Sequence, residues 1–162
     1  MLSQSDKDVF TVRADNTSFN ETVLAAVDGG SNSRRIIEKT ASLSQDRTSV
    51  FVVYVNDALR PYAEDELSDE LPTLNRALKS IEARKRGQIE SLMAESDILA
   101  SSLIISRGRA SREIKKVVRE LNTTLLVMGS GMHTGMSWAL GSTANNILHG
   151  IQSSALILRT ST

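Results

Sequence analysis

A glycine-rich stretch holds the residues of this chain that are best suited to ligand binding. An apolar run from Thr124 to Met128 stops at Gly129, further glycines follow, and Gly141 and Ser142 then precede a predicted helix. Glycine lets a backbone approach an anion closely, and free N–H groups at a helix start point toward it. Ser142 is also a favourable N-cap residue. The order of strand, glycine loop and helix start favours a phosphate site, although any α/β protein needs tight turns there.

The composition is that of an ordinary globular protein. The 162 residues are enough for one domain with a sizeable core, with 40% hydrophobic and 23% charged residues. Lys and Arg together number 19, as do Asp and Glu, so the net charge of zero argues against a nucleic-acid binder. The chain has no cysteine and only two histidines, which argues against a metal site formed by protein side chains. No apolar run could span a bilayer and no signal core is present, so we expect a cytoplasmic protein without membrane contact.

Apolar runs alternate with helical patterns along most of the chain. The runs are continuously apolar, which is typical of parallel strands covered by helices on both faces. We therefore predict a doubly wound α/β domain over residues 21–162, preceded by a flexible tail over the polar, aperiodic residues 1–20. The predicted strands are Thr22–Val27, Ser49–Val55, Leu99–Ser106, Thr124–Met128 and Ala155–Leu158.

The predicted helices fill the intervals between these strands. A long helix follows from apolar residues between Leu74 and Met93, and its basic segment Arg84-Lys85-Arg86 is expected to face water. A clean apolar face predicts a helix over Ser111–Leu121, and a shorter one is expected from Ser142 to about His149.

Two glycine turns fall where predicted strands end. Asp28-Gly29-Gly30 follows the first strand, and Gly129-Ser130-Gly131 follows the fourth. In open parallel sheets, ligands bind outside the carboxyl ends of the strands, at the point where the strand order reverses. The two turns are therefore the places where a ligand site is expected.

Four segments of the chain resemble the universal stress protein family. The segment Val27-Asp28-Gly29-Gly30-Ser31-Asn32-Ser33 is similar to the end of the family's first strand, and Tyr54-Val55-Asn56-Asp57 to the end of its second. The segment from Arg107 to Ile114 is similar to the G-x-P-A-x-x-I turn, with Arg109 in place of proline. Leu125 to Ser130, followed by Leu140-Gly141-Ser142, resembles the closing nucleotide signature. The resemblance covers about residues 20 to 159.

The resemblance implies a five-stranded parallel sheet in the order 3-2-1-4-5 and a regulatory module that binds ATP, or ADP or AMP, in a stress response. Mg²⁺ or Mn²⁺ would accompany the phosphates, hydrolysis would be slow at most, and no residue would be catalytic. The base and ribose would lie near Asp28 and Val55. The nucleotide-binding residues implied are Asp28, Val55, Met128, Gly129, Gly131, Gly141, Ser142 and Thr143.

The resemblance also implies a homodimer. Family members commonly pair antiparallel through their last strand. Here Ala155–Leu158 is apolar and is expected at a sheet edge, and exposed edges invite pairing.

Departures from the signature leave other functions open. The signature is G-x-x-G, nine residues, then G-S or G-T, but Met132 stands three places after Gly129 and Gly131 comes one place early. Gly141 is twelve places after Gly129, so the loop is one residue short. One alternative is a dimeric stress or partner-binding protein without nucleotide. Another is an adenylating enzyme, because residues 28–33 faintly resemble the S-G-G-x-D-S loop of ATP pyrophosphatases.

Overall fold

The computed structural model describes residues 8–11, 21–57, 72–130 and 141–159. Their strands form one six-stranded sheet in the order β1-β6-β5-β2-β3-β4. The strands are β1 (Val9–Thr11), β2 (Val23–Val27), β3 (Val50–Asn56), β4 (Leu103–Arg107), β5 (Leu125–Gly129) and β6 (Ser154–Leu158). The helices are α1 (Ser33–Leu43), α2 (Pro72–Glu95), α3 (Ala110–Glu120) and α4 (Ser142–Leu148), with short 3-10 turns at Arg47–Ser49 and Ala100–Ser102.

The five strands from β2 to β6 are parallel and confirm the predicted sheet. Counted as the five predicted strands, their order is 3-2-1-4-5. The third of them begins at Leu103 rather than Leu99, because Ala100–Ser102 forms a 3-10 turn before the strand starts. The other strand boundaries fall close to the ends of the apolar runs, because strands buried on both faces require apolar residues.

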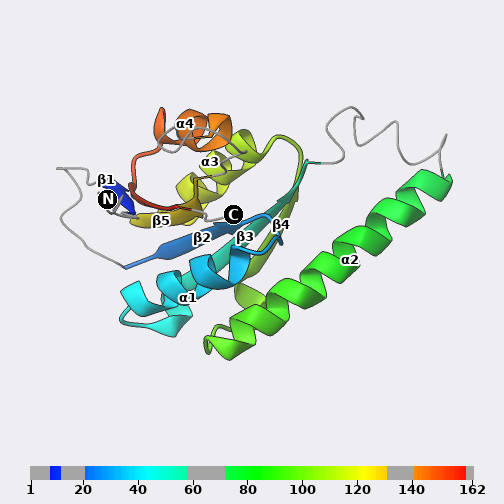
Figure 1. Ribbon diagram of the computed structural model, residues 1–162, viewed down its shortest axis with the longest axis horizontal. Coiled ribbons are helices and arrows are strands. Elements are labelled where there is room, and N and C mark those ends of the chain that lie inside the picture. The colour runs from blue at the N-terminus through cyan, green and yellow to red at the C-terminus, as the bar shows by residue number, and fades with distance from the viewer. Residues whose placement is uncertain (1–7, 12–20, 58–71, 131–140, 160–162) are drawn as a thin grey trace, which may run out of the picture.

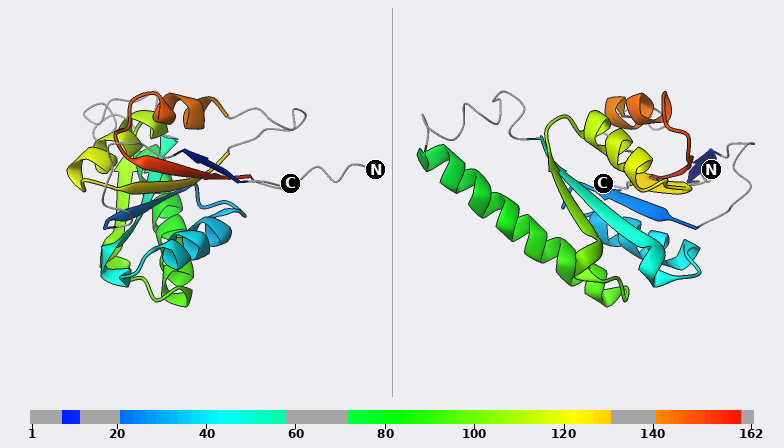
Figure 2. Two further views of the ribbon diagram at one scale, coloured as in Figure 1. Left: turned by 90° about the vertical axis from the view of Figure 1, so that its left-hand side faces the viewer. Right: turned by 180° about the vertical axis from the view of Figure 1, so that it is seen from behind.

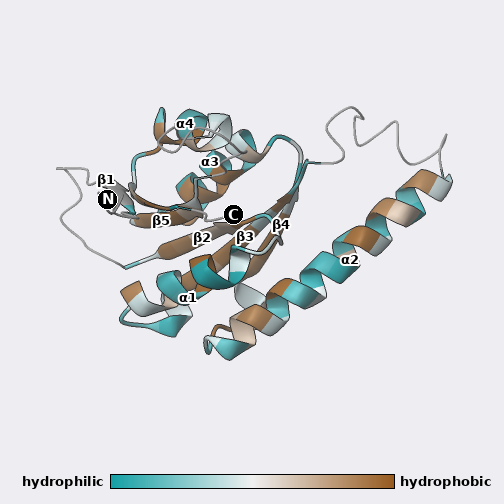
Figure 3. Ribbon diagram, viewed as in Figure 1, coloured by the Kyte–Doolittle hydropathy of each residue, from teal (hydrophilic) through white to brown (hydrophobic). Residues whose placement is uncertain are grey.

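Helices cover both faces of the sheet. Figure 1 shows α1 and α2 on one face and α3 and α4 on the other, and the turned views of Figure 2 agree. Side chains of successive strand residues point to opposite faces, so each strand contributes to two separate cores. The core under α1 and α2 includes Ala25, Ile37, Val52, Ile89 and Met93. The core under α3 and α4 includes Leu24, Val53, Val118, Leu126 and Ile147. Figure 3 shows these strands as an apolar layer between two helical layers.

Strand β1 was not expected from the sequence. It pairs antiparallel with β6, with Val9 opposite Ile157. Asp8 fixes its start, because its Oδ1 accepts hydrogen bonds from Arg35 Nη2 at 3.1 Å and from the backbone N–H of Arg159 at 3.2 Å. The expectation of a tail therefore does not describe residues 9–11, and the expectation that the last strand forms the sheet edge is wrong. Three β-forming residues are too few to show a period in the sequence.

Helix α2 is longer than the face of the sheet that it covers. Its second half is anchored by Ile89 and Met93, which are fully buried, whereas Ile81 in the first half is 45% exposed. Figures 1 and 2 show the first half extending past the sheet. Within the described ranges, no helix combines the length and the apolar character needed to cross a membrane.

Candidate functional site

The strand order reverses between β2 and β5. From β2 the chain moves outward through β3 and β4, and then returns to place β5 on the other side of β2. Ala26 pairs with Met128, so the same register brings Val27 opposite Gly129, and Asp28 follows at the same edge of the sheet. The structure thus brings together the two glycine turns that the sequence singled out, at the carboxyl edge where ligands of such sheets bind.

The turn after β2 is built around the exposed side chain of Asp28. Its Oδ1 accepts a hydrogen bond from the backbone N–H of Gly30 at 2.7 Å and one from Ser33 Oγ at 3.4 Å. Gly29 has a φ of +68°, a left-handed conformation that favours glycine. The turn therefore holds the Asp28 carboxylate in place through one of its two oxygens.

Lys85 of α2 also contacts this turn, which sequence reasoning missed. Its Nζ donates a hydrogen bond to the carbonyl oxygen of Gly29 at 2.6 Å. The prediction that the segment Arg84-Lys85-Arg86 faces water is correct for the exposed Arg84 and Arg86 but wrong for Lys85, which is half-buried. The periodicity of a basic run does not reveal a contact across 56 positions of sequence.

A second contact of α2 reaches the end of β4. Arg107 donates from Nε to Glu82 Oε2 at 3.0 Å and from Nη2 to Oε1 at 3.2 Å. These hydrogen bonds lower the pKa of Glu82, while burial raises the pKa of Tyr54 at the end of β3, an effect to which the Glu82 and Asp28 carboxylates add. Helix α2 therefore joins the ends of β2 and β4 through charged side chains at the carboxyl edge.

Two apolar site residues lie on the other face of the sheet. Val55 is half-buried and packs against the core under α3 and α4. Met128 is 4% exposed and belongs to the same core. Both side chains thus lie on the face of the sheet that α3 and α4 cover. A base could pack against the half-buried Val55, whereas the Met128 side chain is too buried for a large contact.

The glycine loop after β5 is held at both ends. The Ser130 N–H donates to the carbonyl oxygen of Leu158 at 2.9 Å, and the Gly141 N–H donates to that of Ser130 at 2.9 Å. Gly141 therefore returns to the end of β5, beside Gly129. The predicted site residue Gly131 lies outside the described residues.

Helix α4 begins at Ser142, the residue at which the sequence predicts its start, but its N-cap is not the predicted one. Gly141, with φ −57° and ψ 154°, occupies the N-cap position and makes no side-chain hydrogen bond to the helix start. The prediction that Ser142 is the N-cap is therefore wrong, because Ser142 is already the first helical residue. Ser142 and Thr143 are exposed, and the first N–H groups of a helix have no acceptor within the helix.

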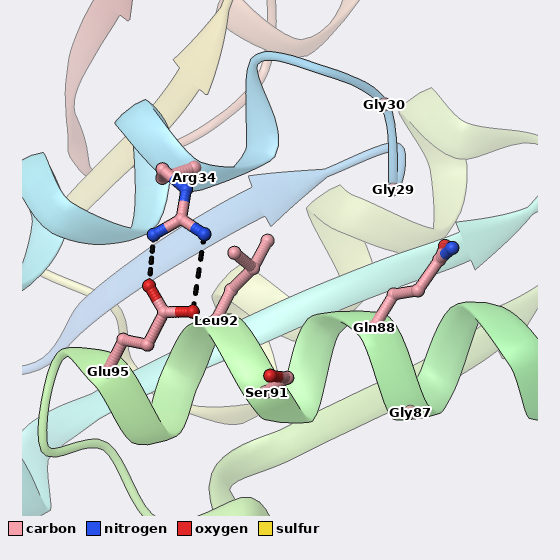
Figure 4. Close-up of a pocket in the computed structure, with 8 residues that line it drawn as sticks. All are labelled: Gly29, Gly30, Arg34, Gly87, Gln88, Ser91, Leu92 and Glu95. Carbon is pink, nitrogen blue, oxygen red and sulfur yellow. Dashed lines mark hydrogen bonds and ion pairs between the residues drawn. The ribbon is translucent and has the colours of Figure 1, made fainter.

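A shallow groove of about 530 Å³ lies behind the Asp28 turn (Figure 4). Gly29, Gly30 and Arg34 line one side, and the other is formed by α2. Arg34 and Glu95 form an ion pair with two hydrogen bonds at one end of it. The residues of α2 that line the groove are Gly87, Gln88, Ser91, Leu92 and Glu95.

Comparison with known proteins identifies a family. The model of the universal stress protein family matches residues 20–159. No curated protein is similar enough in sequence to count as a match.

Solved structures share the fold. A protein of unknown function from Pseudomonas aeruginosa PAO1 is 25% identical with a TM-score of 0.62, over 92% of this chain and 50% of its own. The present chain thus spans about half the length of that relative. A universal stress protein solved in complex with cAMP is 17% identical (TM-score 0.54, 89% and 100% of the two chains). A universal stress protein from Archaeoglobus fulgidus, solved in complex with dAMP, is 13% identical (TM-score 0.55, 87% and 99%).

Proposed function

The chain belongs to the universal stress protein family, and on this premise we propose that it is a regulatory module that binds ATP or a related adenine nucleotide. The observation that carries the proposal is the meeting of the Asp28 turn with Gly129 and the Gly141 helix start at the switch point of the sheet. Two proteins of the same fold were solved with the adenine nucleotides cAMP and dAMP, which supports this choice of ligand.

The proposed nucleotide lies across the carboxyl edge on the side of α4. Its base and ribose lie near Asp28 and Val55, next to the end of β5 at Met128. Its phosphates meet backbone N–H groups and hydroxyls at Gly129, Gly131, Gly141, Ser142 and Thr143, where a helix start favours negative charge. Nine residues separate Gly131 from Gly141, as the signature requires, so the missing residue falls before Gly131.

The proposed cation, Mg²⁺ or Mn²⁺, binds through the phosphates. Among the described residues, no group of three or more His, Cys, Asp or Glu could hold a metal ion. We expect the nucleotide to bring the cation with it. We assign no catalytic residue and expect slow hydrolysis at most. The cytoplasmic location expected from the sequence belongs to this proposal, and cell fractionation tests it.

Calorimetry tests the proposal directly. We expect ATP with Mg²⁺ to bind with one site per chain, and ADP or AMP to show how much the outer phosphates contribute. Mass spectrometry of the protein after purification and denaturation should detect a co-purified nucleotide. The absence of binding heat for ATP, ADP and AMP at about 1 mM nucleotide would reject the proposal.

The irregular loop favours a second candidate, a nucleotide-free partner-binding protein of the same fold. If the loop is instead aligned from Gly129, Met132 stands in place of the signature's second glycine, and the phosphate site would lack that glycine. A ligand that binds only the folded protein raises its melting temperature. A melting temperature that does not change with ATP would therefore favour this candidate.

We further propose a homodimer through the edge of β6, in competition with β1. The two strands pair over three residues only, so little backbone hydrogen bonding opposes the exchange. Deletion of residues 1–11 should uncover the edge and shift the protein toward a dimer in analytical ultracentrifugation. If the truncated chain is no more dimeric than the full chain at equal concentration, β6 is not the dimer surface.

A further inference from the structure

One peptide group in the Asp28 turn is held from two sides. The carbonyl oxygen of Gly29 accepts a hydrogen bond from Lys85 Nζ at 2.6 Å. The N–H of Gly30, which belongs to the same peptide group, donates to Asp28 Oδ1 at 2.7 Å. In a trans peptide the C=O and N–H point in opposite directions, so Lys85 and Asp28 pull on the group from opposite ends.

We propose that Lys85 is a positioning residue of the nucleotide site, which acts through this peptide group on the Asp28 carboxylate. An ammonium group that binds the carbonyl oxygen polarises the peptide and strengthens its N–H as a donor. The stronger N–H then fixes the Asp28 carboxylate against rotation. The inference rests on the proposed nucleotide function and adds to it a residue on a helix that the family signature does not include.

The approach of Lys85 depends on the glycine at position 29. A Cβ on Gly29 would lie 2.7 Å from Cδ of Lys85, which is closer than carbon atoms can pack. The φ of +68° at Gly29 also favours glycine. A side chain at position 29 would therefore force the Lys85 side chain to move away.

The position of Lys85 itself is fixed by the rest of α2. Ile89, one turn further along, is fully buried under the sheet. Glu82, one turn before, is held by the two hydrogen bonds from Arg107. Anchors on both sides leave the Lys85 backbone little freedom, and a contact between rigid elements positions its partner well.

Lys85 and the proposed ligand lie on different sides of the turn. Helix α2 covers one face of the sheet, whereas Val55 and Met128 contribute to the core on the other face. Lys85 therefore contacts the turn from the face of the sheet opposite the proposed ligand, and its effect on the ligand must pass through Asp28.

Calorimetry on the full chain tests this role. Lys85→Met keeps the length of the side chain and removes the charge, and we expect it to weaken ATP binding about fivefold. Lys85→Arg, which can still donate to the Gly29 carbonyl, should recover most of the affinity. Lys79→Met removes an exposed lysine from the same helix and should leave binding unchanged. Unchanged affinity in Lys85→Met would overturn the inference.

Two further measurements separate this inference from the proposed function. The amide proton resonance of Gly30 should move upfield in Lys85→Met without any nucleotide, and a resonance that stays in place would refute the positioning role. If the wild-type protein binds no nucleotide, the proposed function fails while this resonance still reports on the contact. In an Asp28→Asn background, Lys85→Met should have little additional effect on ATP affinity. A full fivefold loss there would mean that Lys85 does not act through Asp28.

Discussion

Gly141→Asp is expected to weaken ATP binding by at least about 100-fold while the protein stays folded. A carboxylate at the start of α4 would lie beside the proposed phosphates, and like charges about 4 Å apart near a protein surface repel by roughly 4 kcal/mol. The φ of −57° and ψ of 154° at Gly141 suit any residue. Aspartate is a preferred N-cap, so the free energy of unfolding should stay constant or rise by about 0.5 kcal/mol. Calorimetry and urea denaturation measure the two effects.

Gly141→Asn is the matched control. Asparagine has nearly the same shape as aspartate and also caps helices, but it is neutral. The ratio of ATP affinities between the two variants isolates the effect of charge from that of added bulk. Equal affinities of the two variants would show that no anionic group binds at the start of α4.

Asp28→Asn should weaken adenine-nucleotide binding by about 10- to 100-fold. The amide oxygen of asparagine can still accept the hydrogen bond from Gly30, so the turn is kept. Its NH₂ group then replaces the second carboxylate oxygen and cannot accept a hydrogen bond from a base or ribose donor. Losing a hydrogen bond to a charged group costs about 1.5 to 3 kcal/mol, which corresponds to this range. Titration calorimetry with AMP, which has the base and ribose but fewer phosphates, reports the effect most directly.

An inorganic phosphate or triphosphate titration supplies the control for Asp28→Asn. These ligands have no base or ribose, so their affinity should be the same in the variant and in the wild-type protein. A variant that binds AMP as tightly as the wild type does would remove Asp28 from the proposed site.

The sheet could be predicted from the sequence because its strands are buried on both faces. Continuous apolar runs mark β2, β3 and β5, and the alternation with helices requires them to be parallel. Strand β1 could not be predicted in this way. Its three residues form a strand because they pair with β6, and a local sequence pattern does not indicate a pairing partner so distant in sequence.

The part of the candidate site that strand order positions could be predicted from the sequence. Asp28 follows β2 and Gly129 ends the neighbouring parallel strand β5, so the strand order places both at one edge of the sheet. The position of Lys85 was not predictable, because it depends on how α2 crosses the sheet and on the space above Gly29. The N-cap of α4 was misplaced by one residue, because glycine and serine both cap helices and their order alone does not decide which one does.

The pairing of β1 with β6 gives the molecule an order of assembly. The hydrogen bond between Asp8 and Arg159 spans 151 positions, so a segment that leaves the ribosome early finds its partner only after the other described strands have been made. Domains fold as they are synthesised, and an edge strand without a partner is exposed to association with other chains in the meantime. The β1 segment can therefore cover this edge only once β6 has been synthesised, and its pairing completes the sheet of the described strands.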